Sequence, residues 1–308
     1  MKRIVIFALA LIICFAITSC FIRRSFSFGI NRVTYGSYSD AAKYQTGSFS
    51  YRSSDVTKIS LSYVSGDVLI VQSDSRTLNA TESGKGISDD QAMRWYLANG
   101  TLDIQFCKSG YSGSIPAKTL VLEIPYGVDL EIGMTSGDVT FDTDVTAGDV
   151  KMGSTSGGKH IKGLFCADFK EGSTSGDTSI DALHAVDAEF GSTSGNTTIG
   201  KLEADDVETA ATSGSLSIST VSCGRLDIGA TSGNITLGLE KCDKLKIGCT
   251  SGNVTLTRLP SGGASIEFNK TSGSLKADGY MVKGGRMVYG DGSCKADITT
   301  TSGDLTIK

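Results

Sequence analysis

Apolar and polar residues alternate along most of this chain, in short runs that stand on either side of a recurring glycine turn. Around Gly66, apolar residues occupy the seventh, fifth and third positions before the glycine and the second and fourth positions after it. Period-two alternation is typical of strands that bury one face. The pattern therefore predicts two short strands per turn, each with alternate side chains pointing into a core.

The turn itself is the tripeptide Thr-Ser-Gly, which recurs at a nearly fixed spacing. Successive steps between its glycines are 20, 19, 19, 19, 19, 19, 21 and 30 residues. The turn glycines are Gly137, Gly157, Gly176, Gly195, Gly214, Gly233, Gly252, Gly273 and Gly303. This period is too short for a repeat of two helices and falls in the range of stacked β-coils. It predicts an all-β, single-domain parallel β-solenoid (β-helix) of about 19 residues per coil, with two short strands per coil.

The segment Gln72–Tyr126 departs from the repeat and carries the only tryptophan, Trp95. Its alternating runs predict strands, two of them joined by a turn at Asn99-Gly100. We expect it to form an N-terminal β cap over the open end of the stack. Two alternating runs around Gly-Gly predict a hairpin near 280–290. The predicted parts are an anchor at 1–22, a spacer at 23–58, a first coil and β cap at 59–127, and solenoid repeats at 128–308.

The N-terminal residues have the pattern of an export and membrane-anchoring segment. Lys2 and Arg3 precede an apolar run from Ile4 to Ile22. The small residues before Cys20 resemble a bacterial lipobox, which predicts cleavage and lipidation at Cys20. The same run is also long enough for an uncleaved transmembrane helix. Both alternatives predict an extracytoplasmic, membrane-anchored protein.

Composition limits the partners. The formal net charge is −4 and 20% of residues are charged, without a basic stripe, which argues against nucleic acid as a partner. The expected partners are the membrane, through the N-terminal anchor, and a glycan or protein ligand at the cell surface. The sequence does not determine the oligomeric state.

Two outward columns of the repeat are as regular as the core. The position six residues before each turn glycine, called −6 below, is charged in every coil, with acidic residues and lysines alternating. Position −4 is glycine in most coils, which predicts a β-bulge or, alternatively, a flat groove for a partner. Glu171 and Lys159 fall in apolar columns; we expect a local bulge that turns both outward, with a buried ion pair as the alternative.

Candidate chemistry is sparse. Asp or Asn often follows the turn glycine, but turn formation explains it better than calcium binding, so no metal site and no cofactor are predicted. His160 and His184 lie in different columns, and no catalytic residues are predicted. Cys223 and Cys242 occupy the same column in adjacent coils, where other coils have alanine; we expect both to be reduced.

Several motifs together resemble a known family. They are Ser65-Gly66-Asp67-Val68, the segment from Ile87 to Trp95, Leu122-Glu123-Ile124-Pro125 and the serial Thr-Ser-Gly turns. These are similar to the bacterial "putative adhesin" domain family of β-helical proteins, over about residues 56 to 308. The resemblance implies a β-helical fold and an envelope location, and it carries over no catalytic motif.

The sequence thus predicts a non-enzymatic, envelope-anchored surface protein, an adhesin or an interaction and scaffold module. The alternatives are an envelope-stress sensor or regulator, and a polysaccharide-processing β-helix enzyme. A cluster of carboxylates in a cleft would favour the enzyme.

Overall fold

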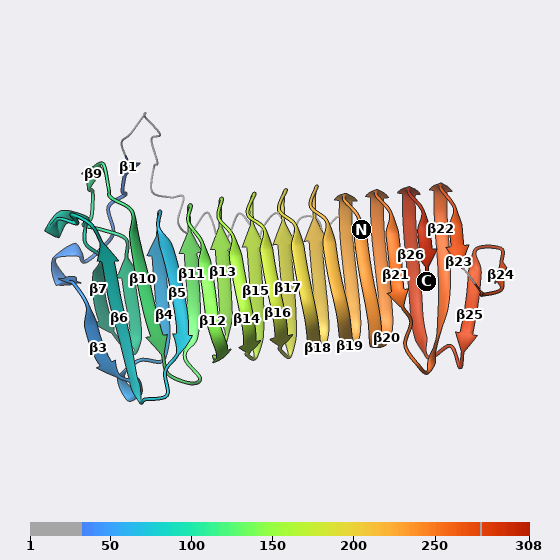
Figure 1. Ribbon diagram of the computed structural model, residues 1–308, viewed down its shortest axis with the longest axis horizontal. Helices are drawn as coiled ribbons and strands as arrows, with labels where there is room; N and C mark the ends of the chain where they lie inside the picture. The colour runs from blue at the N-terminus through green and yellow to red at the C-terminus, as the bar shows by residue number, and fades with distance from the viewer. Residues whose placement is uncertain (1–32, 278) are drawn as a thin grey trace. The chain divides into compact units, whose positions relative to one another are not determined.

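The computed structural model describes residues 33–277 and 279–308. The described chain divides into two compact units, residues 33–167 and residues 168–308, which we treat separately. Both consist of β-strands, most of them paired in parallel within a mixed sheet, as coloured along the chain in Figure 1. The prediction of an all-β, mostly parallel protein is therefore confirmed.

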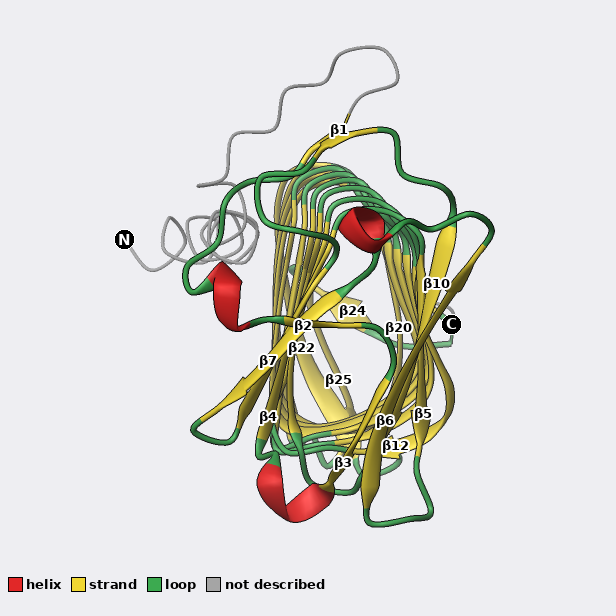
Figure 2. Cartoon of the chain, turned by 90° about the vertical axis from the view of Figure 1, so that its left-hand side faces the viewer, coloured by secondary structure: helices red, strands yellow, loops and turns green. Residues whose placement is uncertain are grey.

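The strands of the first unit are β1 (Val33–Thr34), β2 (Gln45–Thr46), β3 (Phe49–Arg52), β4 (Lys58–Tyr63), β5 (Asp67–Gln72), β6 (Thr77–Gly84), β7 (Arg94–Ala98), β8 (Thr101–Gln105), β9 (Ser112–Gly113), β10 (Lys118–Ile124), β11 (Asp129–Met134), β12 (Val139–Thr146), β13 (Val150–Ser154) and β14 (Lys159–Phe165). Three short 3-10 helices, red in Figure 2, lie in its connections: η1 (Ala41–Lys43), η2 (Ser53–Asp55) and η3 (Asp89–Gln91).

The strands of the second unit are β15 (Asp168–Ser173), β16 (Thr178–His184), β17 (Asp187–Ser192), β18 (Thr197–Ala211), β19 (Leu216–Ser232), β20 (Ile235–Ser251), β21 (Val254–Arg258), β22 (Gly263–Ser272), β23 (Leu275–Ala277), β24 (Val282–Lys283), β25 (Arg286–Gly290), β26 (Cys294–Ser302) and β27 (Leu305–Ile307).

The first unit contains two parallel ladders of strands. One ladder is β8–β4–β11–β13, and the other is β10–β5–β12–β14. The register follows the apolar columns, since Ile59 pairs with Leu130 and Leu61 with Ile132. β4 and β5 therefore lie between strands that come later in the sequence.

Antiparallel strands close one end of this unit. β7 pairs with β8 through the turn at Asn99 (φ 51°) and Gly100 (φ 77°), and β6 pairs with β10. β2 and β3 then pair with β7 and β6, so part of the predicted spacer is ordered here. The aromatic residues of the cap meet at this end, where Trp95 lies 4.7 Å from Phe49 between ring centroids.

In the second unit, the strands from β15 to β21 pair with the strand one repeat away. Ala188 of β17 pairs with Val207 of β18, and Leu226 of β19 pairs with Leu245 of β20, both 19 residues apart. Inward side chains form continuous ladders. The column at +4 is at most 1% exposed in Ile180, Ile199, Ile218, Leu237, Leu256 and Ile307. Each such side chain contributes about 1.5–3 kcal/mol through removal from water.

The last coil is out of sequence order. β26 lies between β20 and β22, and β27 lies between β21 and β23, as Figure 1 shows for β26. Sequence order would place them beyond β22 and β23. The other edge of β22 is instead covered by β25, which runs antiparallel to it and pairs with β24 around Gly284 and Gly285. The 30-residue step between the last two turn glycines provides the length for the chain to turn back.

Candidate interaction face and N-terminal cap

The turn glycines stack on one another. A Cβ atom built on Gly195 would lie 2.0 Å from the carbonyl oxygen of Gly176, and one on Gly214 would lie 1.9 Å from that of Gly195. No side chain fits at such separations. The stacking also shows the spatial order of the last three turns, Gly252, Gly303 and Gly273, because Gly303 contacts Gly252 and Gly273 contacts Gly303.

In most repeats, the side chain of the residue after the turn glycine accepts a hydrogen bond from the backbone of a neighbouring repeat. Oδ1 of Asp177 accepts a hydrogen bond from the backbone N–H of Asn196 at 2.8 Å, and Oδ1 of Asn196 accepts one from Ser215 at 3.0 Å. Oδ1 of Asn253 likewise accepts one from Asp304 at 2.9 Å. These oxygens serve as backbone acceptors. No group of three or more His, Cys, Asp or Glu among the described residues is arranged to hold a metal ion.

A charged face covers the outer side of six neighbouring strands in the second unit, namely β15, β17, β18, β19, β20 and β26. It consists of positions −8 and −6, which point the same way because they are two residues apart. Position −8 reads Asp168, Asp187, Asp206, Arg225, Lys244, Lys295 in spatial order. Position −6 reads Lys170, Glu189, Glu208, Asp227, Lys246, Asp297. We call these twelve residues the charged face.

The acidic half of the charged face is hollowed. A groove of about 240 Å³ is lined by its residues from Asp168 to Asp227, with six carboxylates and two cations. Lys170 lies 3.3 Å from Glu189, and Arg225 lies 3.1 Å from Asp227. Burial, followed by the neighbouring Glu189 and Asp227, raises the pKa of Glu208. The simple alternation of acid and lysine expected for position −6 is therefore wrong, since Glu189, Glu208 and Asp227 are consecutive.

Several charges on this face lack an internal partner. Within the described part of the chain, no hydrogen bond or ion pair reaches the side chains of Asp187, Asp206, Glu208, Lys244 or Lys246. Asp187, Asp206 and Lys244 are exposed, and Glu208 and Lys246 are half-buried. The acidic and the basic members thus remain available to an external partner.

The glycines at position −4 lie in regular strands, so the predicted bulge is wrong. Gly229 pairs with Gly248, and Gly191 with Ala210, without a register shift, and none of these glycines has a left-handed φ. A Cβ atom on Gly248 would meet nothing within 4 Å. Next to this glycine, a second groove of about 140 Å³ includes Thr250, Thr299 and Thr301 in its lining. Where it is glycine or alanine, position −4 carries no large side chain.

The cap of the first unit holds a buried ion pair. Nζ of Lys118 lies 2.8 Å from Oε1 of Glu82, with side-chain exposures of 0% and 5%. Lys118 also donates to the carbonyl oxygens of Gln91 and Phe106, and Glu82 accepts from the Tyr63 hydroxyl at 2.6 Å. Burial lowers the pKa of Lys118, and the pair with Glu82 opposes that shift. All three N–H groups of this ammonium have acceptors, so the pair is structural.

Glu171 and Lys159 do not turn outward, contrary to the expected bulge. Glu171 is 0% exposed and accepts a hydrogen bond from the Thr178 hydroxyl at 3.2 Å in its own unit. Lys159 is 3% exposed and donates to Oγ of Ser154 at 2.6 Å in its own unit. Polar side chains can occupy these inward positions because each has a hydrogen-bonding partner.

The cysteines of the described chain are free thiols. Cys223 and Cys242 face each other on β19 and β20 with their Sγ atoms 3.8 Å apart, which is longer than a disulfide bond. A hydrogen bond with Cys223 and burial both raise the pKa of Cys242, to about 12. Cys294 of the inserted coil also hydrogen bonds to Cys242, a neighbour that the linear spacing did not reveal.

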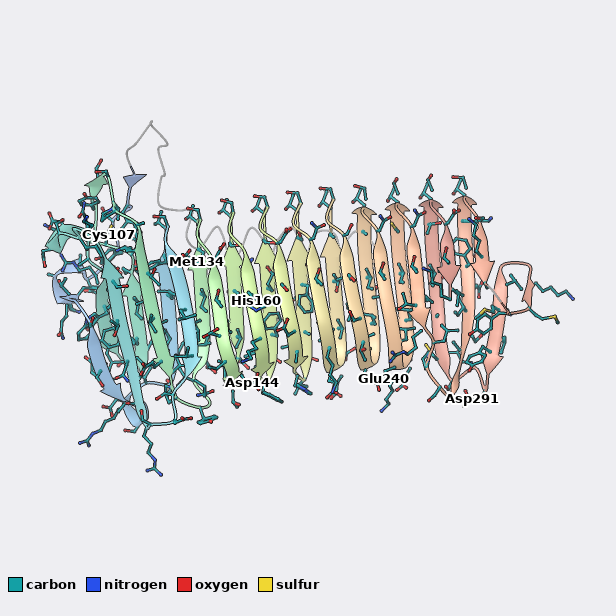
Figure 3. All side chains as sticks on the ribbon, viewed as in Figure 1. Cys107, Met134, Asp144, His160, Glu240 and Asp291 are labelled. Atoms are coloured by element: carbon teal, nitrogen blue, oxygen red, sulfur yellow. The ribbon has the colours of Figure 1, made fainter. Side chains whose placement is uncertain are left out.

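The two histidines lie on strands of different units. His160 lies on β14 of the first unit (Figure 3), and His184, on β16 of the second, has Nδ1 2.7 Å from Oε2 of Glu203. Cys20 and the predicted anchor lie outside the described residues. Within residues 33–277 and 279–308, no helix has the length and apolar character needed to span a bilayer.

Two features of the candidate site are missing from the sequence-based prediction. One is the charged column at −8, although Asp168, Asp187 and Asp206 recur at the repeat period. The Lys118–Glu82 pair also had a signal, because Lys118 has the same parity as Leu120 and Leu122, which point inward.

Stacked glycine turns, side-chain hydrogen bonds between successive turns and mostly parallel strands define a class of repetitive all-β protein. The chain belongs to the Toastrack DUF4097 family, whose model matches residues 56–308. The family resemblance drawn from the motifs is therefore confirmed.

Solved structures that match this chain at low sequence identity are described as putative adhesins or as a putative cell adhesion protein. A "putative adhesin" from Parabacteroides merdae ATCC 43184 shares 13% identity over 84% of this chain and 96% of that chain, with a TM-score of 0.44. One from Bacteroides fragilis NCTC 9343 shares 12% over 86% and 97%, with a TM-score of 0.39. A "putative cell adhesion protein" from Clostridium sporogenes ATCC 15579 shares 12% over 86% and 99%, with a TM-score of 0.23. A search of curated proteins finds no match.

Proposed function

We propose that this chain is a non-enzymatic interaction protein of the cell envelope, an adhesin or scaffold, that binds through the charged face of its second unit. The observation that carries the proposal is the set of charges without an internal partner on one face of six neighbouring strands, part of which is hollowed into a groove. Unpaired charges on a rigid surface supply specificity and rapid association. The adhesin descriptions of structures with similar folds point in the same direction.

The repeat supplies the rigidity that such a surface needs. We infer that the units of about 19 residues are the coils of a parallel β-solenoid, with two short strands per coil and the antiparallel strands of the first unit as its cap. Each coil contacts only its neighbours, so a row of side chains at one position forms a continuous column. A binding face can then extend along the stack without a change of fold.

The proposed location is extracytoplasmic, with the chain held at the membrane by a lipid on Cys20 or by an uncleaved N-terminal helix. Mass spectrometry of the N-terminal peptide from membranes tests this. A lipidated cysteine at the new N-terminus is the expected result for the lipoprotein, and an unmodified residue 1 excludes it. Recovery of the chain in the soluble cytoplasmic fraction would overturn both forms of anchoring.

The binding proposal is tested with the full chain on an array of glycans and envelope components. We expect a signal that Asp206→Lys/Glu208→Lys abolishes, since this change reverses the acidic half of the charged face. Asp142→Lys/Asp181→Lys, the same charge change at exposed residues outside the charged face, should leave the signal intact. In a deletion strain, loss of attachment supports adhesion, whereas an altered response to cell-wall damage alone would support the stress-sensor alternative.

One observation favours the enzyme alternative. The acidic groove contains a carboxyl group with a raised pKa, Glu208, beside Glu189 and Asp227. Two neighbouring carboxyl groups of which one has a raised pKa are a feature of glycosidase sites. Release of reducing ends from envelope polysaccharide that is lost in Glu208→Gln would establish this function, and no release by the wild-type chain would dismiss it.

A further inference from the structure

The partner of the charged face can be identified from the order of its charges. Counting positions −8 and −6 together, the coil of Asp206 and Glu208 carries two negative charges. The coil of Lys244 and Lys246 carries two positive charges. Between them lies one coil, in which Arg225 and Asp227 neutralise each other at 3.1 Å. The face is therefore acidic on one side of a neutral coil and basic on the other.

A surface with this order is complementary to itself. A two-fold axis that lies in the contact plane, parallel to the strands and over the Arg225–Asp227 coil, reverses the order of coils but keeps positions along each strand. It places Asp206 opposite Lys244 and Glu208 opposite Lys246, each of them twice. These four side chains lack an ion-pair partner in their own chain within the described residues. We propose that the partner of this face is a second copy of this chain, in an isologous dimer about that axis.

The next coils outward agree with this arrangement at position −8. Asp187 falls opposite Lys295, again with opposite charges. At position −6, Glu189 falls opposite Asp297, but Glu189 already pairs with Lys170 at 3.3 Å and Asp297 accepts from the Asn269 amide at 3.5 Å. On the axis itself, Arg225 falls opposite Arg225 of the second copy and Asp227 opposite its Asp227. At each of these like-charge positions at least one charge has an ion-pair partner in its own chain, Lys170 for Glu189 and the Arg225–Asp227 pair on the axis, which offsets the repulsion.

The charged side chains are the part of the face that reaches a partner, because Gly191, Ala210 and Gly229 at position −4 are buried. Position −4 carries glycine or alanine in the central coils, and Gly229 lies on the proposed axis. The glycines stand in regular strands, so their backbones present no side chain to the partner. The charged side chains at −6 and −8 then reach across beside this strip. The proposal deepens the proposed function by naming the partner of the same face: anchored copies would bind one another.

The contact area predicts a weak, salt-sensitive dimer. Six strands about 4.8 Å apart, each presenting about six residues at 3.3 Å, cover about 570 Å² per copy, or about 1,100 Å² in total. This lies at the low end of specific interfaces, which indicates a dissociation constant on the order of 10 μM. Because screening lengths shrink from about 10 Å to 3 Å between 0.1 and 1 M salt, association should weaken about tenfold or more over that range.

The test is sedimentation velocity of the full chain, in detergent with a large excess of micelles so that two anchors do not share one micelle. Wild type should dimerise at low salt. Lys244→Glu/Lys246→Glu makes both coils that flank the axis acidic, and Asp206→Lys/Glu208→Lys makes both of them basic. Each variant alone should be monomeric at tenfold higher concentration than wild type, because like charges then face each other.

The decisive measurement is the equimolar mixture of the two variants. In the mixture an acidic face meets a basic face, so the dimer should return with an affinity near that of wild type. Recovery also shows that both variants are folded. Lys162→Glu/Lys241→Glu, which makes the same charge change off the face, should dimerise like wild type.

A wild type that stays monomeric at low salt, a mixture that stays monomeric, or a control that loses the dimer equally would each overturn the proposal. The measurement does not require the anchor. Failure of the dimer and failure of envelope localisation therefore give separate results, the first in the centrifuge and the second in the N-terminal mass spectrum.

Discussion

The buried ion pair in the cap yields a sharp stability prediction. Lys118→Met removes the ammonium that lies 2.8 Å from Glu82 and 4.0 Å from the ring centroid of Phe106. Methionine fills a similar volume but donates no hydrogen bond. The change removes the cation that pairs with Glu82, whose side chain is only 5% exposed. It also removes the donor that serves the carbonyl oxygens of Gln91 and Phe106.

The expected loss is about 3–5 kcal/mol in the free energy of unfolding, the cost of leaving one member of a buried pair uncompensated. Lys118→Met/Glu82→Gln should recover about 1–3 kcal/mol of that loss, because the amide is neutral, its single oxygen can accept from the backbone N–H of Met93, and its NH2 group can donate to the Tyr63 hydroxyl. Lys108→Met breaks the exposed pair with Asp90, at 2.9 Å, and should cost less than about 1 kcal/mol.

Urea unfolding followed by tryptophan fluorescence measures these values in the cap itself. Trp95 is the only tryptophan, is 7% exposed and packs against Phe49. If Lys118→Met lost no more than Lys108→Met, the pair would not be a buried charge pair and the reasoning would be refuted.

Other changes test the turns and the thiols. Gly214→Ala puts a Cβ atom 1.9 Å from a carbonyl oxygen of the preceding coil and should cost about 1–3 kcal/mol or more in urea unfolding, whereas Gly248→Ala, with open space, should be nearly neutral. Asn253→Ala removes the acceptor of the N–H of Asp304 and should cost about 0.5–1.5 kcal/mol in the same assay. Burial raises the pKa of Cys107 from 9.0 to about 12. Its thiol therefore ionises at lower pH in the unfolded state than in the folded state. The contribution of Cys107 to the free energy of unfolding, fully present below pH 9, should fall by about 2 kcal/mol by pH 10.5, and Cys107→Ala should remove this part of the pH dependence. Equal pH dependence in the two proteins would contradict this.

The sequence predicts the strands and core columns well because period two and period 19 act together. An apolar residue at +4 in every coil, as in Ile199 and Ile218, has no other explanation than a shared inward column. Local turn chemistry also suffices for Asn99-Gly100, where both residues adopt left-handed backbone conformations.

Polar residues in the core were harder to place. Glu171 was expected to point outward because a charge at an inward position is costly, yet it is buried with a Thr178 hydrogen bond. The expected bulge at the −4 glycines failed for a related reason. A glycine in a strand can also leave a surface flat, and only the continuous register of Gly229 and Gly248 distinguishes the two cases.

The spatial order of the repeats cannot be predicted from local sequence, and it determines which charges are neighbours on the charged face. Every coil presents nearly the same edges, so β20 can pair with β22 or β26, and the choice depends on the hairpin that covers the other edge of β22. In sequence order, Lys244 would have Ser265 beside it. The inserted coil instead places Lys295 next to Lys244, so the basic half of position −8 extends over three neighbouring coils from Arg225. The match of Lys295 with Asp187 across the proposed two-fold axis therefore exists only because the chain turns back on itself.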